Sequence, residues 1–157
     1  MSFTNDATYA WTIDSTSSNS GTYSAMNDAV PSGGGTGDLS LTIDTVSGDM
    51  SFAYRASVES GWDYLRFYVD GTLDAQWSAT DTGWNSHSTS VSSGTHTFTW
   101  RFYRDSCCSG GANTVWIDDI SIPTSAELSY TASYISTGGV GLTDGDYFGV
   151  TDYAGTV

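Results

Sequence analysis

The stretch from Gly94 to Pro123, GTHTFTWRFYRDSCCSGGANTVWIDDISIP, decides the fold. In its first half Phe98, Trp100 and Phe102 alternate with polar residues, which is the two-residue period of a half-buried strand. Its second half begins with an apolar run that ends in an acidic pair. Residues 105–112 between them are small and polar, as loops are. We therefore expect a long hairpin whose aromatic side chains face the rest of the domain.

Similar strand patterns recur throughout the chain. They cover residues 9–14, 21–26, 39–43, 50–54, 64–69, 73–77 and 84–91. Asp70-Gly71 and the segment Val46–Asp49 carry hairpin turn signals, and Leu65, Phe67 and Val69 are expected to point inward. The polar segment 84–91 suits an edge strand. No helical period is sustained, and turn signals recur about every 8–12 residues. The sequence predicts an all-β protein, an antiparallel jelly-roll β-sandwich.

Charge and composition exclude several classes of function. The 157 residues include 18 acidic and four basic ones, for a formal net charge of −14. This field repels nucleic acid, so we expect no nucleic-acid partner. No run of about 20 apolar residues occurs, which predicts no membrane insertion. No leader opens the chain, yet its Ser, Thr, Gly and Tyr content and the absence of Lys indicate a secreted protein.

The two cysteines, Cys107 and Cys108, are adjacent in the sequence. Neighbouring cysteines cannot clip two strands together. They can form a vicinal disulfide, pair with another chain or stay reduced. Outside the cell an exposed thiol pair oxidises, which favours the vicinal disulfide.

After Pro123 the character of the sequence changes. Residues 1–123 are expected to form the sandwich and residues 124–157 a C-terminal tail with two strands and no core of its own. An isolated pair of strands is marginal in water, so the tail has to dock on its own domain or on a neighbouring subunit, unless it opens a further module. The tail residues expected to make the assembly contacts are Leu128, Tyr130, Tyr134, Tyr147, Phe148 and Val150.

Several spaced blocks resemble one known group of modules. They are WTID (11–14), SGTYSA (20–25), SFAY (51–54), WDYLRFYVDG (62–71), QWS (76–78), GTHTFTW (94–100) and WIDDI (116–120). Together they resemble the bacterial extracellular jelly-roll modules of the MAM-like and gingipain cleaved-adhesin type, within the concanavalin A-like sandwiches. The resemblance covers about residues 7–123 and implies an extracellular adhesive, structural or enzyme-accessory role.

Two departures from that group suggest an assembly mechanism. Related modules begin with an acidic-aromatic strand that lies near the closing Trp-Ile-Asp-Asp strand, and residues 1–6 lack this motif. The tail is the second departure, because a single module does not need it. We hypothesise that the tail of one subunit supplies a strand to the next, as in donor-strand complementation. Such a head-to-tail contact does not close on itself and generates filaments.

A structural calcium ion is also implied by the resemblance. In such modules the closing acidic pair, here Asp118 and Asp119, often helps to hold it. The partner acid of the first strand is missing here, and Asp105, Asp144 and Asp146 are possible substitutes. The alternative is that these carboxylates accept hydrogen bonds from turn amides or pair with arginine.

No catalytic constellation emerges, and we expect a protein that is not an enzyme. His87 and His96 lack a third ligand for zinc, and no Gly-x-Ser-x-Gly elbow occurs. Trp62, Trp77 and Trp84 lie near predicted turns or strand ends, where their rings could stack on sugars, although buried sandwich aromatics are the commoner explanation. The sequence predicts a subunit of a surface filament that binds copies of itself. The alternative is a glycan-binding accessory module of a larger secreted protein.

Overall fold

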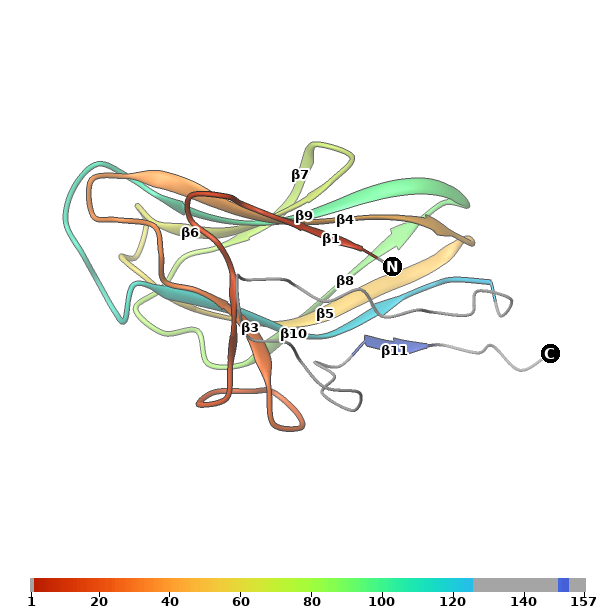
Figure 1. Ribbon diagram of the computed structural model, residues 1–157, viewed down its shortest axis with the longest axis horizontal. Coiled ribbons are helices and arrows are strands. Elements are labelled where there is room, and N and C mark those ends of the chain that lie inside the picture. The colour runs from red at the N-terminus through yellow and green to blue at the C-terminus, as the bar shows by residue number, and fades with distance from the viewer. Residues whose placement is uncertain (1, 126–149, 153–157) are drawn as a thin grey trace.

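The structure is a computed structural model, which describes residues 2–125 and 150–152. Two antiparallel sheets lie face to face, and the described residues contain no helix (Figure 1). This confirms the all-β sandwich that the sequence predicts. In the described residues no helix is long and apolar enough to cross a membrane.

The first sheet has five strands. Their order is β1 (Phe3–Asn5), β4 (Gly35–Thr45), β9 (Gly94–Arg104), β6 (Tyr64–Val69) and β7 (Thr72–Trp77). Residues 3–5 carry no strand pattern that the sequence analysis detected, yet Phe3 pairs with Leu41 and extends the sheet at the β4 edge.

The second sheet places β10 at its centre. Its order is β2 (Thr12–Asp14), β3 (Ser24–Asn27), β10 (Thr114–Ile122), β5 (Gly48–Ser57) and β8 (Asn85–Val91), with β11 (Val150–Asp152) also paired to β10. The polar strand β8 lies at an edge, as predicted.

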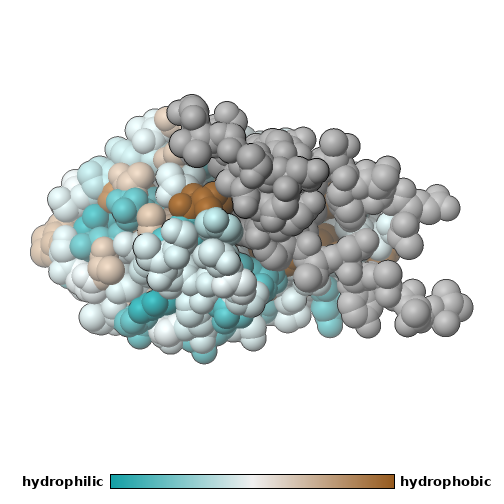
Figure 2. Space-filling view, turned by 60° about the horizontal axis from the view of Figure 1, so that its bottom comes forward, coloured by the Kyte–Doolittle hydropathy of each residue, from teal (hydrophilic) through white to brown (hydrophobic). Residues whose placement is uncertain are grey.

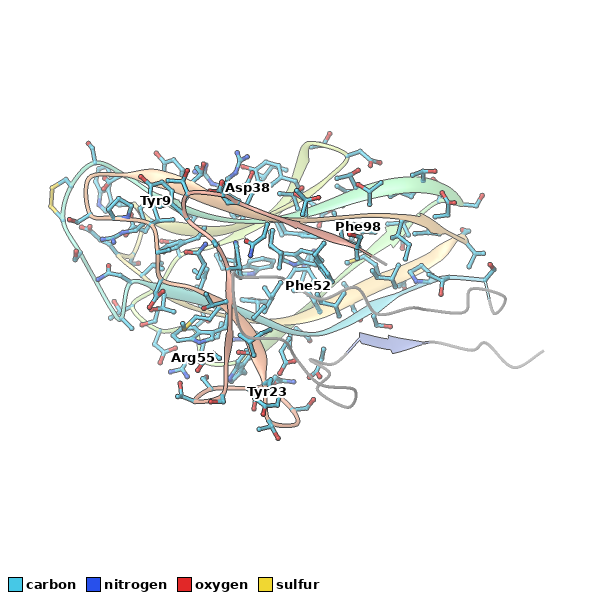
Figure 3. The ribbon with its side chains drawn as sticks, viewed as in Figure 1. Tyr9, Tyr23, Asp38, Phe52, Arg55 and Phe98 are labelled. Atoms are coloured by element: carbon cyan, nitrogen blue, oxygen red, sulfur yellow. A yellow bond between two sulfur atoms is a disulfide. The ribbon has the colours of Figure 1, made fainter. Side chains whose placement is uncertain are left out.

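Alternating apolar side chains fill the space between the sheets. Phe98, Trp100 and Phe102 of β9 are fully buried, and so are Leu65 and Phe67 of β6, which confirms the predicted inward faces. Figure 3 shows Phe52 and Phe98 between the sheets. The ring centroids of Phe52 and Phe67 lie 4.8 Å apart, and that of Trp100 lies 5.4 Å from each of them. These three rings form the centre of the core.

The predicted hairpin between β9 and β10 is wrong. β9 pairs with β4 and β6 in one sheet, whereas β10 pairs with β3 and β5 in the other. The loop after Arg104 therefore crosses from one sheet to the other, and the two strands meet across the core instead of through backbone hydrogen bonds. The turn 46–49 is likewise a crossing between sheets, because β4 and β5 do not pair with each other.

The hairpin predicted at Asp70-Gly71 is confirmed. β6 and β7 pair antiparallel around it, with Val69 opposite Thr72. Asp70 and Gly71 have φ angles of 50° and 77°. Positive φ at both central residues is the type I′ requirement, which matches the twist of the flanking strands.

Two strands from distant parts of the chain share one side of β10. β3 pairs with Val115–Ile117, and β11 pairs in parallel with Ile120–Ile122. Between these segments, the register of β10 against β5 on its other side shifts between Asp118 and Ser121, and Asp119 adopts a φ of 48°. Residues 150–152 therefore continue this side of β10 beyond the end of β3.

The described surface is largely polar. The face shown in Figure 2 is pale to teal over most of the described residues, with a small brown patch. Among the described residues, the large apolar side chains with high exposure are Val46, Trp62 and Leu73.

Candidate functional site

The outer face of the five-stranded sheet carries tyrosine and arginine side chains. On β6, Tyr64, Arg66 and Tyr68 alternate with the buried Leu65 and Phe67, so they point away from the core. Arg101 and Tyr103 occupy the equivalent outward positions on β9. We call the surface formed by Tyr64, Arg66, Tyr68, Arg101 and Tyr103 the tyrosine–arginine face.

Strand register sets the order of charges across this face. Asp38, Arg101, Arg66 and Gln76 form one row, because each is the cross-strand partner of the next on β4, β9, β6 and β7. Figure 3 shows Asp38 on the outer side of the sheet. Two arginines therefore lie directly opposite each other, an arrangement that destabilises a sheet unless the charges are compensated.

Asp38 compensates one of the two arginines. Its carboxylate accepts hydrogen bonds from Nε and Nη2 of Arg101 at 2.7 and 2.6 Å. These hydrogen bonds raise the pKa of Arg101 above its ordinary value, against the opposing effect of burial. The Arg101 guanidinium also lies 5.1 Å from the ring centroid of Tyr68. Arg101 is therefore a fixed and neutralised part of the face.

Arg66 has a different environment. Its guanidinium carbon lies 4.1 Å from the ring centroid of Tyr103 and 5.0 Å from that of Tyr64. These two tyrosines are themselves cross-strand partners, with centroids 6.3 Å apart. Arg66 Nε donates to Oε1 of Gln76 at 3.2 Å. The guanidinium is thus supported by aromatic rings and oriented by an amide, which limits the freedom that a surface arginine normally has.

Among the described residues, Arg66 is also the arginine that has no carboxylate partner. Arg55, Arg101 and Arg104 each form an ion pair with an aspartate. Within the described residues, no carboxylate lies within 4.0 Å of the Arg66 guanidinium. This is notable in a chain with 18 acids and four basic residues.

A loop with an exposed indole is joined to one end of the face. The Tyr64 hydroxyl donates to the carbonyl oxygen of Gly61 at 2.7 Å. Trp62 follows Gly61, and 61% of its surface is exposed. Glu59 of the same loop packs closely on the β9–β10 loop, since a Cβ on Gly110 would lie 2.8 Å from the Glu59 Cα.

The β9–β10 loop contains the disulfide. Cys107 and Cys108 form a disulfide with each other, which is the alternative that the sequence favoured. Both residues are exposed, and Figure 3 shows the sulfur atoms at one end of the molecule. Arg104 donates to the Cys108 carbonyl oxygen at 3.2 Å, which holds the loop against the sandwich. The loops that contain Trp62 and the disulfide are therefore neighbours beyond the end of the face.

The three tryptophans predicted for glycan stacking have different environments. Trp77 stacks on Tyr54 with centroids 3.9 Å apart and packs against the core. Trp84 is half-buried just before β8. Of the three, Trp62 alone is highly exposed. The sequence analysis did not select the tyrosines, although the Tyr and Arg residues at outward positions of β6 and β9 were a usable signal.

The acidic pair of the predicted calcium site accepts hydrogen bonds from protein donors. Asp118 is buried, and its carboxylate accepts hydrogen bonds from the backbone amides of Asn19, Ser20 and Asp119. Asp119 accepts from the side chains of Asn19 and Ser20. Oxygens that face N–H and O–H donors are already satisfied without a metal ion. Burial raises the pKa of Asp118, and these backbone hydrogen bonds oppose it.

The other residues named for calcium do not join this pair. Asp105 accepts a hydrogen bond from the amide of Cys107 in the β9–β10 loop. Asp144 and Asp146 lie outside the described residues. Within residues 2–125 and 150–152, no group of three or more His, Cys, Asp or Glu side chains could hold a metal ion. The calcium site remains a prediction.

Each histidine pairs with an aspartate. His87 Nε2 lies 2.7 Å from Oδ2 of Asp74, and His96 Nδ1 lies 2.7 Å from Oδ2 of Asp70. Asp70 also accepts from the amide of Thr97 at 2.8 Å. The Thr97 hydrogen bond and then the His96 hydrogen bond lower the pKa of Asp70. These contacts tie turns and edge strands together.

The described residues include one of the predicted assembly residues. Val150 begins β11, whose backbone pairs with β10. Leu128, Tyr130, Tyr134, Tyr147 and Phe148 lie outside the described residues.

Comparison with known proteins finds similarity at the level of structure. No family model and no curated protein matches the sequence. The secreted serine protease VesC from Vibrio cholerae is 16% identical with a TM-score of 0.52, and the match covers 75% of this chain and 25% of the protease. The CBM22-1 xylan-binding domain of Paenibacillus barcinonensis Xyn10C is 14% identical with a TM-score of 0.49, and the match covers 79% and 87% of the two chains. TmCBM61, solved with β-1,4-galactotriose, is 15% identical with a TM-score of 0.47, and the match covers 76% and 84%.

The similarity to VesC supports the fold alone, and this chain spans about a quarter of the length of VesC. The other two structures are carbohydrate-binding modules. The resemblance to MAM-like and cleaved-adhesin modules remains a prediction.

Proposed function

We propose that this protein is an extracellular, non-catalytic glycan-binding module and that the tyrosine–arginine face is its binding surface. The observation that carries the proposal is the fixed arrangement of Tyr64, Arg66 and Tyr103, all half-exposed on the outside of a sheet. Aromatic rings offer apolar faces to the C–H side of sugars, and a guanidinium offers several N–H donors to hydroxyl groups. The preorganised arrangement reduces the entropy cost of binding.

Two neighbouring features extend this surface. Trp62 provides an exposed ring on the loop joined to Tyr64. Gln76 adds an amide beside Arg66. The disulfide between Cys107 and Cys108 supports an extracellular location, because disulfides persist in oxidising compartments.

Ordinary cross-strand stabilisation would explain the same contacts without a ligand. Such pairs contribute roughly 0.2–1 kcal/mol each to a sheet. The test therefore has to separate binding from stability.

The experiment measures glycan binding by face variants that stay folded. Full-length protein is screened on a glycan array, and hits are measured by calorimetry with Tyr64→Ala, Tyr103→Ala and Trp62→Ala. Tyr23→Ala is the matched control, because Tyr23 is half-buried and lies on the other side of the molecule (Figure 3). We expect the face variants to bind about 2- to 10-fold more weakly, since an aromatic contact contributes about 0.5–1.5 kcal/mol, and Tyr23→Ala to bind normally. Binding by folded face variants as tight as that of the wild type would reject the proposal.

A second candidate function is self-assembly by strand addition. It is supported by the position of β11, which comes from the predicted tail 124–157 and pairs with Ile120–Ile122 beyond the end of β3. A parallel pair within one chain needs a crossover connection of a dozen or more residues, whereas a second molecule could supply the same strand without one. We propose residues 1–123 as the sandwich and the tail as a strand donor that acts within or between subunits.

Oligomeric state tests this candidate directly. Light scattering of the full chain over a hundredfold range of concentration should show growing oligomers if the strand is exchanged, and electron microscopy should show fibres. Replacing Thr151 by Pro removes an N–H from β11 and should shift the distribution toward monomers. A full chain that stays monomeric at every concentration would mean that each molecule completes its own sheet.

A further inference from the structure

We infer that the tyrosine–arginine face selects glycans that carry an isolated carboxylate, with Arg66 as the residue that binds it. This rests on the proposed function and specifies its ligand class. The starting observation is a charge imbalance: of the four arginines, three already have an aspartate partner, and within the described residues Arg66 has none.

The strand register explains why this cation is unusual. Arg66 and Arg101 are direct cross-strand partners, and Asp38 neutralises only Arg101. The position opposite Arg66 on its other side is taken by Gln76, which is neutral, although the chain has 16 aspartates. Within the described residues, Arg66 is therefore the member of this row whose positive charge has no carboxylate partner. A bound carboxylate would supply the negative charge beside Arg66 that an acidic residue at position 76 would otherwise supply.

The geometry favours a carboxylate beside a sugar ring. The Arg66 guanidinium is stacked 4.1 Å from Tyr103 and 5.0 Å from Tyr64, so its plane is held while N–H groups remain for a planar, bidentate acceptor. The aromatic rings beside it, and Trp62 beyond, can contact neutral sugars on either side of the acidic one.

The net charge limits how acidic the ligand can be. A chain with a formal charge of −14 repels polyanions at long range, so a polymer with a carboxylate on every residue would be disfavoured. A neutral polysaccharide chain with single uronic acid residues avoids this repulsion and still provides a carboxylate for the Arg66 guanidinium. We therefore assign the ligand as a sparsely acidic polysaccharide.

The test uses a pair of ligands that differ in one group. The first is a neutral oligosaccharide with one glucuronic acid, and the second is the same compound with its carboxyl reduced to the alcohol. Calorimetry with full-length protein should show about 10- to 100-fold tighter binding of the acid, the range expected for a hydrogen bond to a charged group. Equal binding of both compounds would overturn the inference and leave the proposed function intact. Binding of neither this pair nor any other glycan would defeat both.

Variants then assign the effect to Arg66. Arg66→Gln should abolish the preference for the acid while keeping the affinity for the reduced compound, and Arg66→Lys should restore only part of it. Arg55→Gln is the matched control, because it removes the same charge from the opposite side of the molecule. An acid preference that persists in folded Arg66→Gln, or tighter binding of a sulfated analogue than of the uronate, would overturn the assignment.

Discussion

Nε of the Arg104 guanidinium lies 3.4 Å from Oδ2 of the Asp63 carboxylate, and both side chains are almost completely buried. The same guanidinium donates to the carbonyl oxygen of Val30 at 2.9 Å and to that of Cys108 at 3.2 Å. Asp63 also accepts a hydrogen bond from the amide of Asp105. This one ion pair therefore joins the loops before β4, before β6 and after β9.

Breaking this pair should be costly. Arg104→Met leaves the buried Asp63 carboxylate without its cation, and we expect a loss of about 3–5 kcal/mol in the free energy of unfolding. Urea denaturation followed by tryptophan fluorescence measures it. Arg55→Met breaks a more exposed pair with Asp81 and should cost about 1 kcal/mol or less. Equal losses in the two variants would contradict this account.

The core prediction concerns the central ring cluster. Phe52→Ala removes a ring in contact with Phe67, Trp77 and Trp100, and we expect it to lower the unfolding free energy by about 3–5 kcal/mol. Leu73→Ala, at an exposed position on β7, should change it by less than about 0.5 kcal/mol. A small effect of Phe52→Ala would show that the two sheets repack easily.

Two buried or paired carboxylates should give pH dependences of opposite sign. Burial raises the pKa of Asp118, so the folded state holds this proton more tightly than the unfolded state. Its contribution to stability therefore falls as pH rises from about 3.8 through the raised pKa. The hydrogen bond from Arg55, and to a smaller extent that from the Gly83 amide, lowers the pKa of Asp81 to about 2. The contribution of Asp81 to stability is therefore present above about pH 3.8 and is lost as the pH falls toward 2.

Unfolding curves of Asp118→Asn and Asp81→Asn between pH 2 and pH 7 test both signs. The stability of the wild type relative to Asp118→Asn should decline with rising pH, and that relative to Asp81→Asn should increase. Slopes of the same sign would show that burial does not dominate at Asp118.

The Cys107–Cys108 disulfide should contribute less to stability than the nearby Gly111. The bond between Cys107 and Cys108 closes a loop of adjacent residues, and loop-closure entropy of that size is about 1 kcal/mol. Gly111 has a φ of 61°, and a Cβ there would lie 2.5 Å from the Thr80 carbonyl oxygen. We expect a Cys107→Ser/Cys108→Ser double variant to lose about 1 kcal/mol or less and Gly111→Ala to lose about 2 kcal/mol or more, as measured by thermal denaturation. The reverse order would mean that the covalent bond, not the loop packing, holds this end together.

Local sequence patterns predicted the strands but not their partners. Alternation placed Phe98 and Trp100 inside correctly, because burial follows the pleat of a single strand. The turn at Asp70-Gly71 was recognisable because its backbone conformation favours particular residues. Whether residues 46–49 or 105–113 close a hairpin or cross between sheets depends on pairings with distant strands, which turn composition does not encode.

The candidate site shows the same limit. Tyr64 and Tyr103 are ordinary outward residues when each strand is considered alone. Only the register of β6 against β9 brings them together and places Arg66 opposite Arg101. That no acidic residue of the described part of the chain pairs with Arg66 could therefore be seen only after all four strands of the row were aligned.

The crossings between sheets also have a kinetic consequence. Within the described residues, β2–β3 and β6–β7 are the antiparallel pairs formed by consecutive strands, whereas Gly35 pairs with Arg104 and Asn27 with Val115. High contact order of this kind slows folding to milliseconds or seconds, and incomplete sheets expose unpaired edges meanwhile. Refolding from denaturant should accordingly succeed at low protein concentration and lose yield to aggregation as the concentration rises.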